Sequence, residues 1–163
     1  MNNPFSSLFT DIFVDNLEKI LEKYPIFMNV VYWYRYVDDI FVVFKGTERQ
    51  IIIFLDFLNS LHPNIENASE VEENNFINFL DLTITNEDNK LVFDIFHKPI
   101  HTYITINNKS THLYSHKFAA FYAYIHRLIS IPLSLENFQK ELNLIRQIAV
   151  NNDYNLSIVD NIL

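Results

Sequence analysis

The alternation of hydrophobic and polar residues predicts a helix and a strand pair at the start of the chain. Apolar residues recur at helical spacing over Leu8–Tyr24, and Pro25 ends this predicted helix. β-Branched and aromatic residues dominate Phe27–Tyr36 and Ile40–Phe44, which predicts two strands. Because only a short polar connection separates them, we expect a tight hairpin.

A second predicted helix is marked by its ends. Thr47 and Gln50 have the spacing of a capping box, apolar residues follow at helical spacing, and Pro63 stops the pattern. The next segment, Ile65–Glu73, is mixed and acidic and is a candidate strand.

The remaining pattern predicts another hairpin and then helices only. Asn78–Thr85 and Lys90–Phe96 are strand-like, and Asn86–Asn89 is a plausible turn between them without glycine. After Pro99 the periodicity becomes helical. The three predicted helices are Ser115–Ile129, Ser134–Val150 and Leu156–Leu163. The predicted fold class is therefore α+β, with an α+β part over residues 1–97 and an all-helical part over residues 98–163.

Composition narrows the function classes. With 49% hydrophobic residues the 163-residue chain can bury a core. A single glycine excludes a glycine-rich phosphate loop and predicts that Asn often fills left-handed turn positions. The absence of cysteine excludes disulfides and thiolate zinc sites. No apolar run approaches the ~20 residues of a membrane span and no signal peptide is recognisable. We therefore expect an intracellular protein, nuclear or cytoplasmic, neither secreted nor in a membrane.

Charge is distributed unevenly. The chain carries a formal net charge of −8, which disfavours free nucleic-acid binding. Between Phe96 and Ser134, however, there is no Asp or Glu, and four cations give +4, which leaves −12 for the rest. Five of the six histidines lie in the same stretch. This asymmetry predicts one face suited to an anionic partner.

The hairpin tip carries the most specific chemical signal. Asp38 and Asp39 are adjacent between two hydrophobic strands. Nucleotidyl transfer relies on divalent metals about 3.5–4 Å apart, and Mg²⁺ prefers carboxylate oxygens. The competing interpretation is an ordinary turn, where Asp is common because it hydrogen-bonds its own backbone.

The flanking residues favour the first interpretation through a resemblance. Tyr-x-Asp-Asp between hydrophobic strands is the signature of the reverse-transcriptase palm, and Arg35–Phe41 most resembles the Penelope-like retroelement enzymes. Further segments resemble the same family in the same order. They are Met1–Ser7 (its Pro-x-Ser segment), Asn78–Ile84 (its Phe-Leu-Asp strand), Phe96–Pro99 (its Tyr-Arg-Lys-Pro), and His116–Ala120, Arg127–Leu128 and Pro132–Ser134 (its helix-turn-helix-like thumb).

The resemblance implies a fold and roles for particular residues. It implies a partial palm with helices on one face, followed by a thumb-like helical segment. Asp38 and Asp39 would be catalytic ligands of Mg²⁺ or Mn²⁺, with Tyr36 and Val37 near the primer or nucleotide. The implied primer-grip-like residues are Phe79, Leu80 and Asp81, and the implied contacts to nucleic-acid backbone are Lys98, Lys109, Lys117 and Arg127. The implied partners are an RNA template and a DNA primer, with no small-molecule cofactor.

Two departures from the family pattern affect activity. The strand that supplies a third carboxylate, and the nucleotide-binding fingers, have no counterpart in the sequence. The family's glycine in the Pro-x-Ser segment is Asn2, and Phe96-His97 replaces Tyr-Arg, which removes a permanent charge. We therefore expect the isolated chain to be inactive unless an upstream fingers and palm half completes it, in cis or in trans. The alternative is a non-catalytic nucleic-acid-binding helix-turn-helix-like module, or a degenerate remnant.

Other clusters have simpler explanations. His97 and His101, like His112 and His116, are four residues apart, which on a helix could bind zinc, but no further ligand is near and solvated or phosphate-facing rings fit better. Among the aromatic residues after His116, most are expected in the core. Only Tyr122 and Tyr124 are candidates for stacking on bases.

Overall fold

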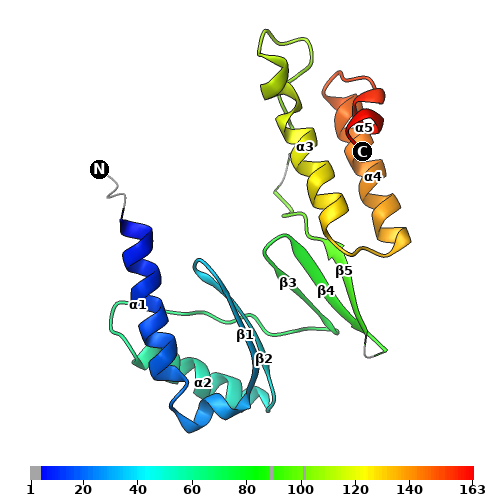
Figure 1. Ribbon diagram of the computed structural model, residues 1–163. Coiled ribbons are helices and arrows are strands. Elements are labelled where there is room, and N and C mark those ends of the chain that lie inside the picture. The colour runs from blue at the N-terminus through cyan, green and yellow to red at the C-terminus, as the bar shows by residue number, and fades with distance from the viewer. Residues whose placement is uncertain (1–4, 89, 101) are drawn as a thin grey trace. The chain divides into compact units, whose positions relative to one another are not determined.

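The computed structural model describes residues 5–88, 90–100 and 102–163, without the side chains of Ser6 and Ser7. Over these residues the chain is α+β, as predicted, with five α-helices and two small antiparallel sheets (Figure 1). It divides into two compact units, Met1–Val71 and Glu72–Leu163.

The first unit is a hairpin with two α-helices. Its elements are α1 (Ser6–Leu21), the 3₁₀ helix η1 (Pro25–Asn29), β1 (Val30–Tyr36), β2 (Asp39–Phe44) and α2 (Glu48–Ser60). The first residues of the predicted Phe27–Tyr36 strand are thus 3₁₀-helical, because Pro25 at the first helical position has the backbone angle of a helix start. At the start of α2, the Thr47 N–H donates to Gln50 Oε1 at 2.8 Å, as the capping-box spacing predicts.

Both helices of this unit contact the same face of the hairpin. Trp33 of β1 donates through Nε1 to Glu18 of α1 at 2.9 Å. The Trp33 ring also lies edge-on to Phe54 of α2, with ring centroids 6.3 Å apart. On the opposite face, Tyr32 and Tyr34 are stacked and exposed. A two-stranded sheet with one bare aromatic face has little intrinsic stability, so the helices supply most of what holds it.

The second unit begins with a three-stranded antiparallel sheet. Its strands are β3 (Phe76–Phe79), β4 (Leu82–Glu87) and β5 (Lys90–Ile95), in the order β3-β4-β5. The predicted single strand Asn78–Thr85 is wrong, since a tight turn at Leu80-Asp81 divides it. The prediction of a strand over Ile65–Glu73 is also wrong, because only Glu73 forms an isolated bridge, to Phe76. The turn predicted at Asn86–Asn89 is shorter in the structure. Glu87 pairs with Lys90, so only Asp88 and Asn89 connect the strands, and Asn89 lies outside the described residues.

Three helices complete the second unit. They are α3 (Tyr114–Ser130), α4 (Leu135–Asn151) and α5 (Ser157–Ile162), close to the predicted ranges. Apolar side chains at helical spacing on each form one core. The buried members are Phe121, Ile125, Leu128, Leu142, Ile145, Ile148, Ala149, Tyr154 and Val159. The sheet joins this bundle through α4, where Asn137 Nδ2 donates to the Phe93 carbonyl at 2.9 Å and Lys140 pairs with Asp94 at 2.5 Å.

The predicted boundary at residues 97 and 98 marks a different division from that of the compact units. In the structure the last strand ends at Ile95, and the next helix begins at Tyr114. The contacts instead group the β3–β5 sheet with the helices that follow it, because β5 packs against α4.

Scarce glycine leaves left-handed backbone to other residues. Seven described non-glycine residues have positive φ, among them Val37 (54°), Leu80 (54°) and Asp88 (49°), which are the first residues of the three hairpin turns. Asn fills such positions at Asn74 and Asn75 only. The expectation that Asn often replaces glycine is thus met in one loop, whereas the hairpins use residues for which this conformation costs energy.

Candidate functional site

The Tyr36–Asp39 hairpin tip is a two-residue turn. Tyr36 pairs with Asp39 as the last residues of β1 and β2, so Val37 and Asp38 form the turn. All four side chains are exposed, and Val37 combines 66% exposure with a left-handed φ of 54°. The structure therefore places both predicted metal ligands next to each other at an exposed tip, on backbone that is strained at the β-branched residue.

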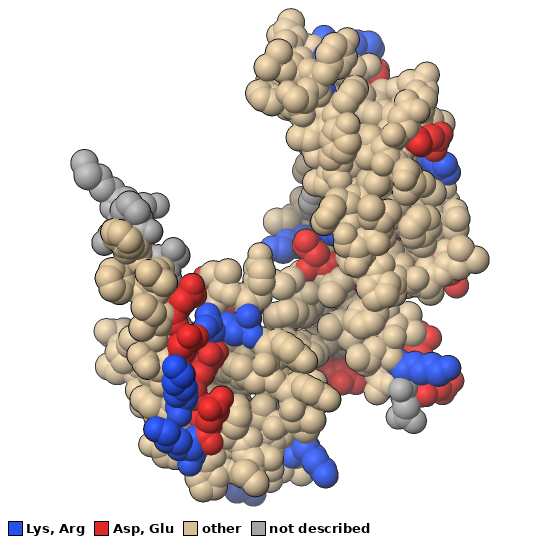
Figure 2. Space-filling model, in the orientation of Figure 1, with Lys and Arg blue, Asp and Glu red and all other residues tan. Residues whose placement is uncertain are grey.

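An acidic row on α1 anchors the hairpin beside this tip. Arg35 of β1 lies 2.9 Å from Glu18, 2.7 Å from Asp15 and 3.5 Å from Asp11. The hydrogen bond with Glu18, reinforced by the negative charges of Glu18 and Asp15, raises the pKa of the Arg35 guanidinium further above its usual value despite partial burial. Figure 2 shows this part of the surface as acidic side chains gathered over α1 beside basic ones.

These α1 acids do not join the two tip aspartates. In the structure they bind the Arg35 guanidinium. Within residues 5–88, 90–100 and 102–163, no three His, Cys, Asp or Glu side chains group as a metal site. The carboxylates of Asp38 and Asp39 are hard oxygen donors, the kind that Mg²⁺ and Mn²⁺ prefer.

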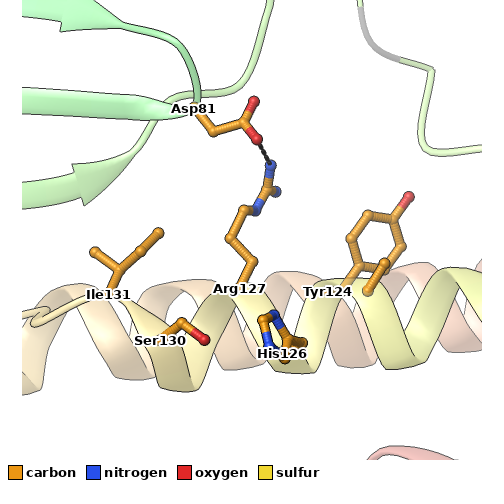
Figure 3. Close-up of a pocket in the computed structure, with 7 residues that line it drawn as sticks. Asp81, Tyr124, His126, Arg127, Ser130 and Ile131 are labelled. Atoms are coloured by element: carbon orange, nitrogen blue, oxygen red, sulfur yellow. Dashed lines mark ion pairs between the residues drawn. The ribbon is translucent and has the colours of Figure 1, made fainter. Parts of the chain in front are cut away.

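The second predicted site, the primer-grip-like turn, contacts α3. Phe79 and Leu82 close the β3–β4 hairpin around Leu80 and Asp81, and Leu80 has a φ of 54°. The Asp81 carboxylate points to Arg127 of α3, at 3.7 Å (Figure 3). The structure thus brings together two residues that the sequence assigned to different roles.

This contact borders an open cavity of about 410 Å³. Its lining residues are Asp81, Ala123, Tyr124, His126, Arg127, Ser130 and Ile131 (Figure 3). Burial is the main cause that raises the pKa of the Tyr124 hydroxyl.

Behind Arg127 lies a buried carboxylate that the sequence did not single out. Glu141 of α4 is 3% exposed, 2.7 Å from His97 Nε2 and 3.7 Å from Arg127. Arg127 Nε is itself buried without a hydrogen-bond partner in the described structure. A buried carboxylate without a partner would destabilise the fold, so the contacts of Glu141 hold His97 and Arg127 against α4. No sequence signal distinguishes Glu141 from a solvated helix residue except its place among the apolar positions of α4.

The four predicted backbone-contacting cations are in different environments. Lys117 is 7% exposed and donates to the Asn108 carbonyl at 2.7 Å. Arg127 is engaged by two acids, as above. Lys109 is exposed and pairs with Asp153 at 3.0 Å. Lys98 is exposed, and no ion pair joins it to another described residue. Only Lys98 and Lys109 are therefore placed to reach a phosphate without rearrangement of the core.

A clamp that the sequence did not reveal holds the segment before α3. Asn152, between α4 and α5, accepts from the Thr105 N–H and donates to the Tyr103 carbonyl. The Tyr154 hydroxyl donates to the Ile106 carbonyl at 2.6 Å. Hydrogen bonds from Asn107 and then Lys109, with the positive charge of Lys109, lower the pKa of the Asp153 carboxyl.

The remaining candidates are partly placed. His112 and His116 are exposed at the start of α3, while His97 binds Glu141 and is half-buried. His101 lies outside the described residues, as do Met1 to Pro4 of the segment compared with the family. Tyr122 is exposed as expected, whereas Tyr124 is half-buried.

Comparison with known proteins concerns the helical part. The model of a family described as the animal helix-turn-helix domain matches residues 104–163. The match covers α3, α4, α5 and the clamped segment before them. The prediction of a helix-turn-helix-like segment is confirmed there. No curated protein matches the chain. No solved structure matches it either.

None of the described helices is both long enough and apolar enough to cross a bilayer.

Proposed function

We propose that residues 104–163 form a nucleic-acid-binding helix-turn-helix module. The observation that carries the proposal is the family match, whose limits coincide with a helical bundle that has its own core and its own clamp. In helix-turn-helix proteins the first helix crosses the phosphate backbone and the second lies in the groove. In this module α3 and α4 have those positions in the chain.

Charge supports the module as the binding part of the chain. Residues 104–163 contain five Lys or Arg and four Asp or Glu, a net charge of +1, so the rest of the −8 chain carries −9. Few cations are available for phosphates, and some already pair with acids. Binding should accordingly be weak. The slope of log affinity against log salt should correspond to only a few phosphate contacts.

Duplex binding measured against salt concentration tests the proposal. We expect affinity to fall as salt rises. Lys109→Gln with Lys140→Gln should weaken binding and reduce the slope of log affinity against log salt by about two phosphate contacts. Lys23→Gln with Lys45→Gln, two exposed lysines of the first unit, is the matched control and should change neither. Absence of salt-dependent binding would contradict the proposal.

The second candidate function is a piece of a retroelement reverse transcriptase of the Penelope-like type. It is favoured by the exposed tip, where Asp38 and Asp39 lie side by side on an anchored hairpin. In that function an upstream fingers and palm half would complete the ligand set. The RNA template and DNA primer would be the substrates. The Phe79–Asp81 turn and the helical module would lie along the primer and template.

Metal binding and primer extension test this candidate separately. We expect Mn²⁺ to broaden NMR signals of residues 36–39 at millimolar concentration, and Asp38→Asn with Asp39→Asn to abolish the effect. Asp11→Asn with Asp15→Asn is the control, since those acids bind Arg35. The isolated chain should show no primer extension. Primer extension that depends on Mg²⁺ and is lost in Asp38→Ala would contradict the expected inactivity. Mn²⁺ broadening that persists in the Asp38→Asn, Asp39→Asn variant would contradict metal binding at the tip.

A further inference from the structure

The outward face of α4 carries a row of amide side chains. Gln139, Asn143 and Gln147 follow each other at intervals of four residues, which places them in one line along a helix. All three are exposed. None of them hydrogen-bonds to another residue in the described part of the chain. The opposite side of α4 holds Leu142 and Ile145 in the core, so this row faces away from α3.

Two cations border the row on its two sides. At 3.6 residues per turn, Lys140 and Arg146 fall on opposite flanks of the line through Asn143. Lys140 pairs with Asp94 of β5, and Arg146 pairs with Asp160 of α5 at 2.9 Å. Both pairs are solvent-exposed enough that water and salt weaken them, so exchange of a carboxylate for a phosphate costs little. Glu136 is the one acid on this face of α4.

This arrangement matches the major groove of duplex DNA. A side-chain amide offers a donor and an acceptor together, which pairs with N7 and N6 of adenine. Four residues of helix rise about 6 Å, close to two base-pair steps of about 3.4 Å. With α4 in the groove, the cations on both flanks would lie toward the phosphates that line its two walls. Double-stranded RNA is disfavoured because its major groove is deep and narrow.

We infer that the Gln139–Asn143–Gln147 row reads adenines in the major groove of duplex DNA, which gives the module a preference for A·T base pairs. The inference rests on the proposed nucleic-acid-binding function and adds the partner and the residues that select it. Residues 104–163 carry a net charge of only +1. Selection by amides rather than by charge is therefore the contribution expected of this module.

Selection from a pool of random duplexes with the full chain tests the inference. We expect enrichment of A·T-containing sites, with about 5- to 150-fold discrimination at each contacted pair. The variant Gln139→Ala, Asn143→Ala, Gln147→Ala should lose the enrichment while it retains salt-dependent binding to random duplex. Asn16→Ala, an exposed amide on α1, is the matched control and should select like the unmodified chain.

The outcomes separate this inference from the proposed function. Salt-dependent duplex binding without A·T preference, or a preference that survives in the triple variant, would overturn the inference alone. Absence of binding to any duplex, with α4 still folded by circular dichroism, would overturn both. Preference for double-stranded RNA over DNA would overturn the groove assignment and leave nucleic-acid binding intact.

Discussion

At the residue scale, the hairpin tip shows what the lack of glycine costs. Val37 is β-branched and exposed, yet it has the left-handed backbone of a turn position. This conformation costs an L-residue about 1–2 kcal/mol. The side chain recovers little of this by packing, because it lies mostly in solvent. The strain is therefore a feature of the backbone that presents Asp38 and Asp39.

Replacement of Val37 by Asn tests this cost. Asn adopts the left-handed region more readily, so Val37→Asn should raise the free energy of unfolding of the first unit by about 1 kcal/mol. Fluorescence of Trp33, the single tryptophan, reports unfolding of this unit in urea. Val31→Asn is the control. Val31 is exposed in a strand, where Asn is unfavourable, so this variant should lower stability. Equal effects of the two substitutions would contradict the strain.

A second residue-scale prediction concerns pH. Because the pKa of Asp153 is lowered in the folded chain, its stabilising effect is complete above about pH 4 and is lost as pH falls through the folded pKa. An NMR titration should give an Asp153 pKa below the ordinary value. Asn107→Ala and Lys109→Gln should each move it back upward. An ordinary or raised pKa in the unmodified chain would contradict the clamp.

Some of these residues are predictable from the sequence, whereas others are not, for a physical reason. Asp38 and Asp39 were predictable at a hairpin tip because the strands around them have a clear pattern. Lys117 and Lys98 look alike in sequence, but one is buried on a carbonyl and the other is exposed. Burial of Lys117 depends on the path of the segment before α3, whose Asn108 carbonyl accepts a hydrogen bond from the ammonium group. Local composition does not encode such contacts.

At the element scale, the turn between α3 and α4 depends on its cap. Ser134 Oγ accepts the Asn137 N–H at 3.1 Å at the start of α4. Ser134→Ala should lower the free energy of unfolding of the second unit by about 1 kcal/mol, while Ser134→Asp should preserve it. Thermal unfolding followed by circular dichroism measures both. Ser130→Ala, exposed in the last turn of α3, is the control. If Ser130→Ala lowers the free energy of unfolding as much as Ser134→Ala does, the capping role of Ser134 is contradicted.

The elements themselves were predictable to different degrees. The three C-terminal helices follow their apolar periodicity closely, because each buries one face in the same core. The split of Asn78–Thr85 is not visible in the pattern, because Leu80-Asp81 forms its turn without glycine or proline. The predicted strand Ile65–Glu73 does not form, since only Glu73 finds a pairing partner, Phe76.

At the scale of the whole molecule, the two units differ in core size. Among described residues of the first unit only Leu21 and Phe54 are buried apolar side chains, whereas the second unit contains the nine-residue cluster around Phe121. In urea, the Trp33 fluorescence transition should therefore precede the circular-dichroism transition of the C-terminal helices. Coincident transitions would show one cooperative unit and contradict this division.

We propose that the helical part of the chain binds duplex nucleic acid through α4. The most direct measurement is amide hydrogen exchange of the full chain with and without duplex DNA, at low salt. We expect protection within residues 135–151 and little change over residues 30–44. Protection confined to the hairpin, or no change anywhere at saturating duplex, would contradict it.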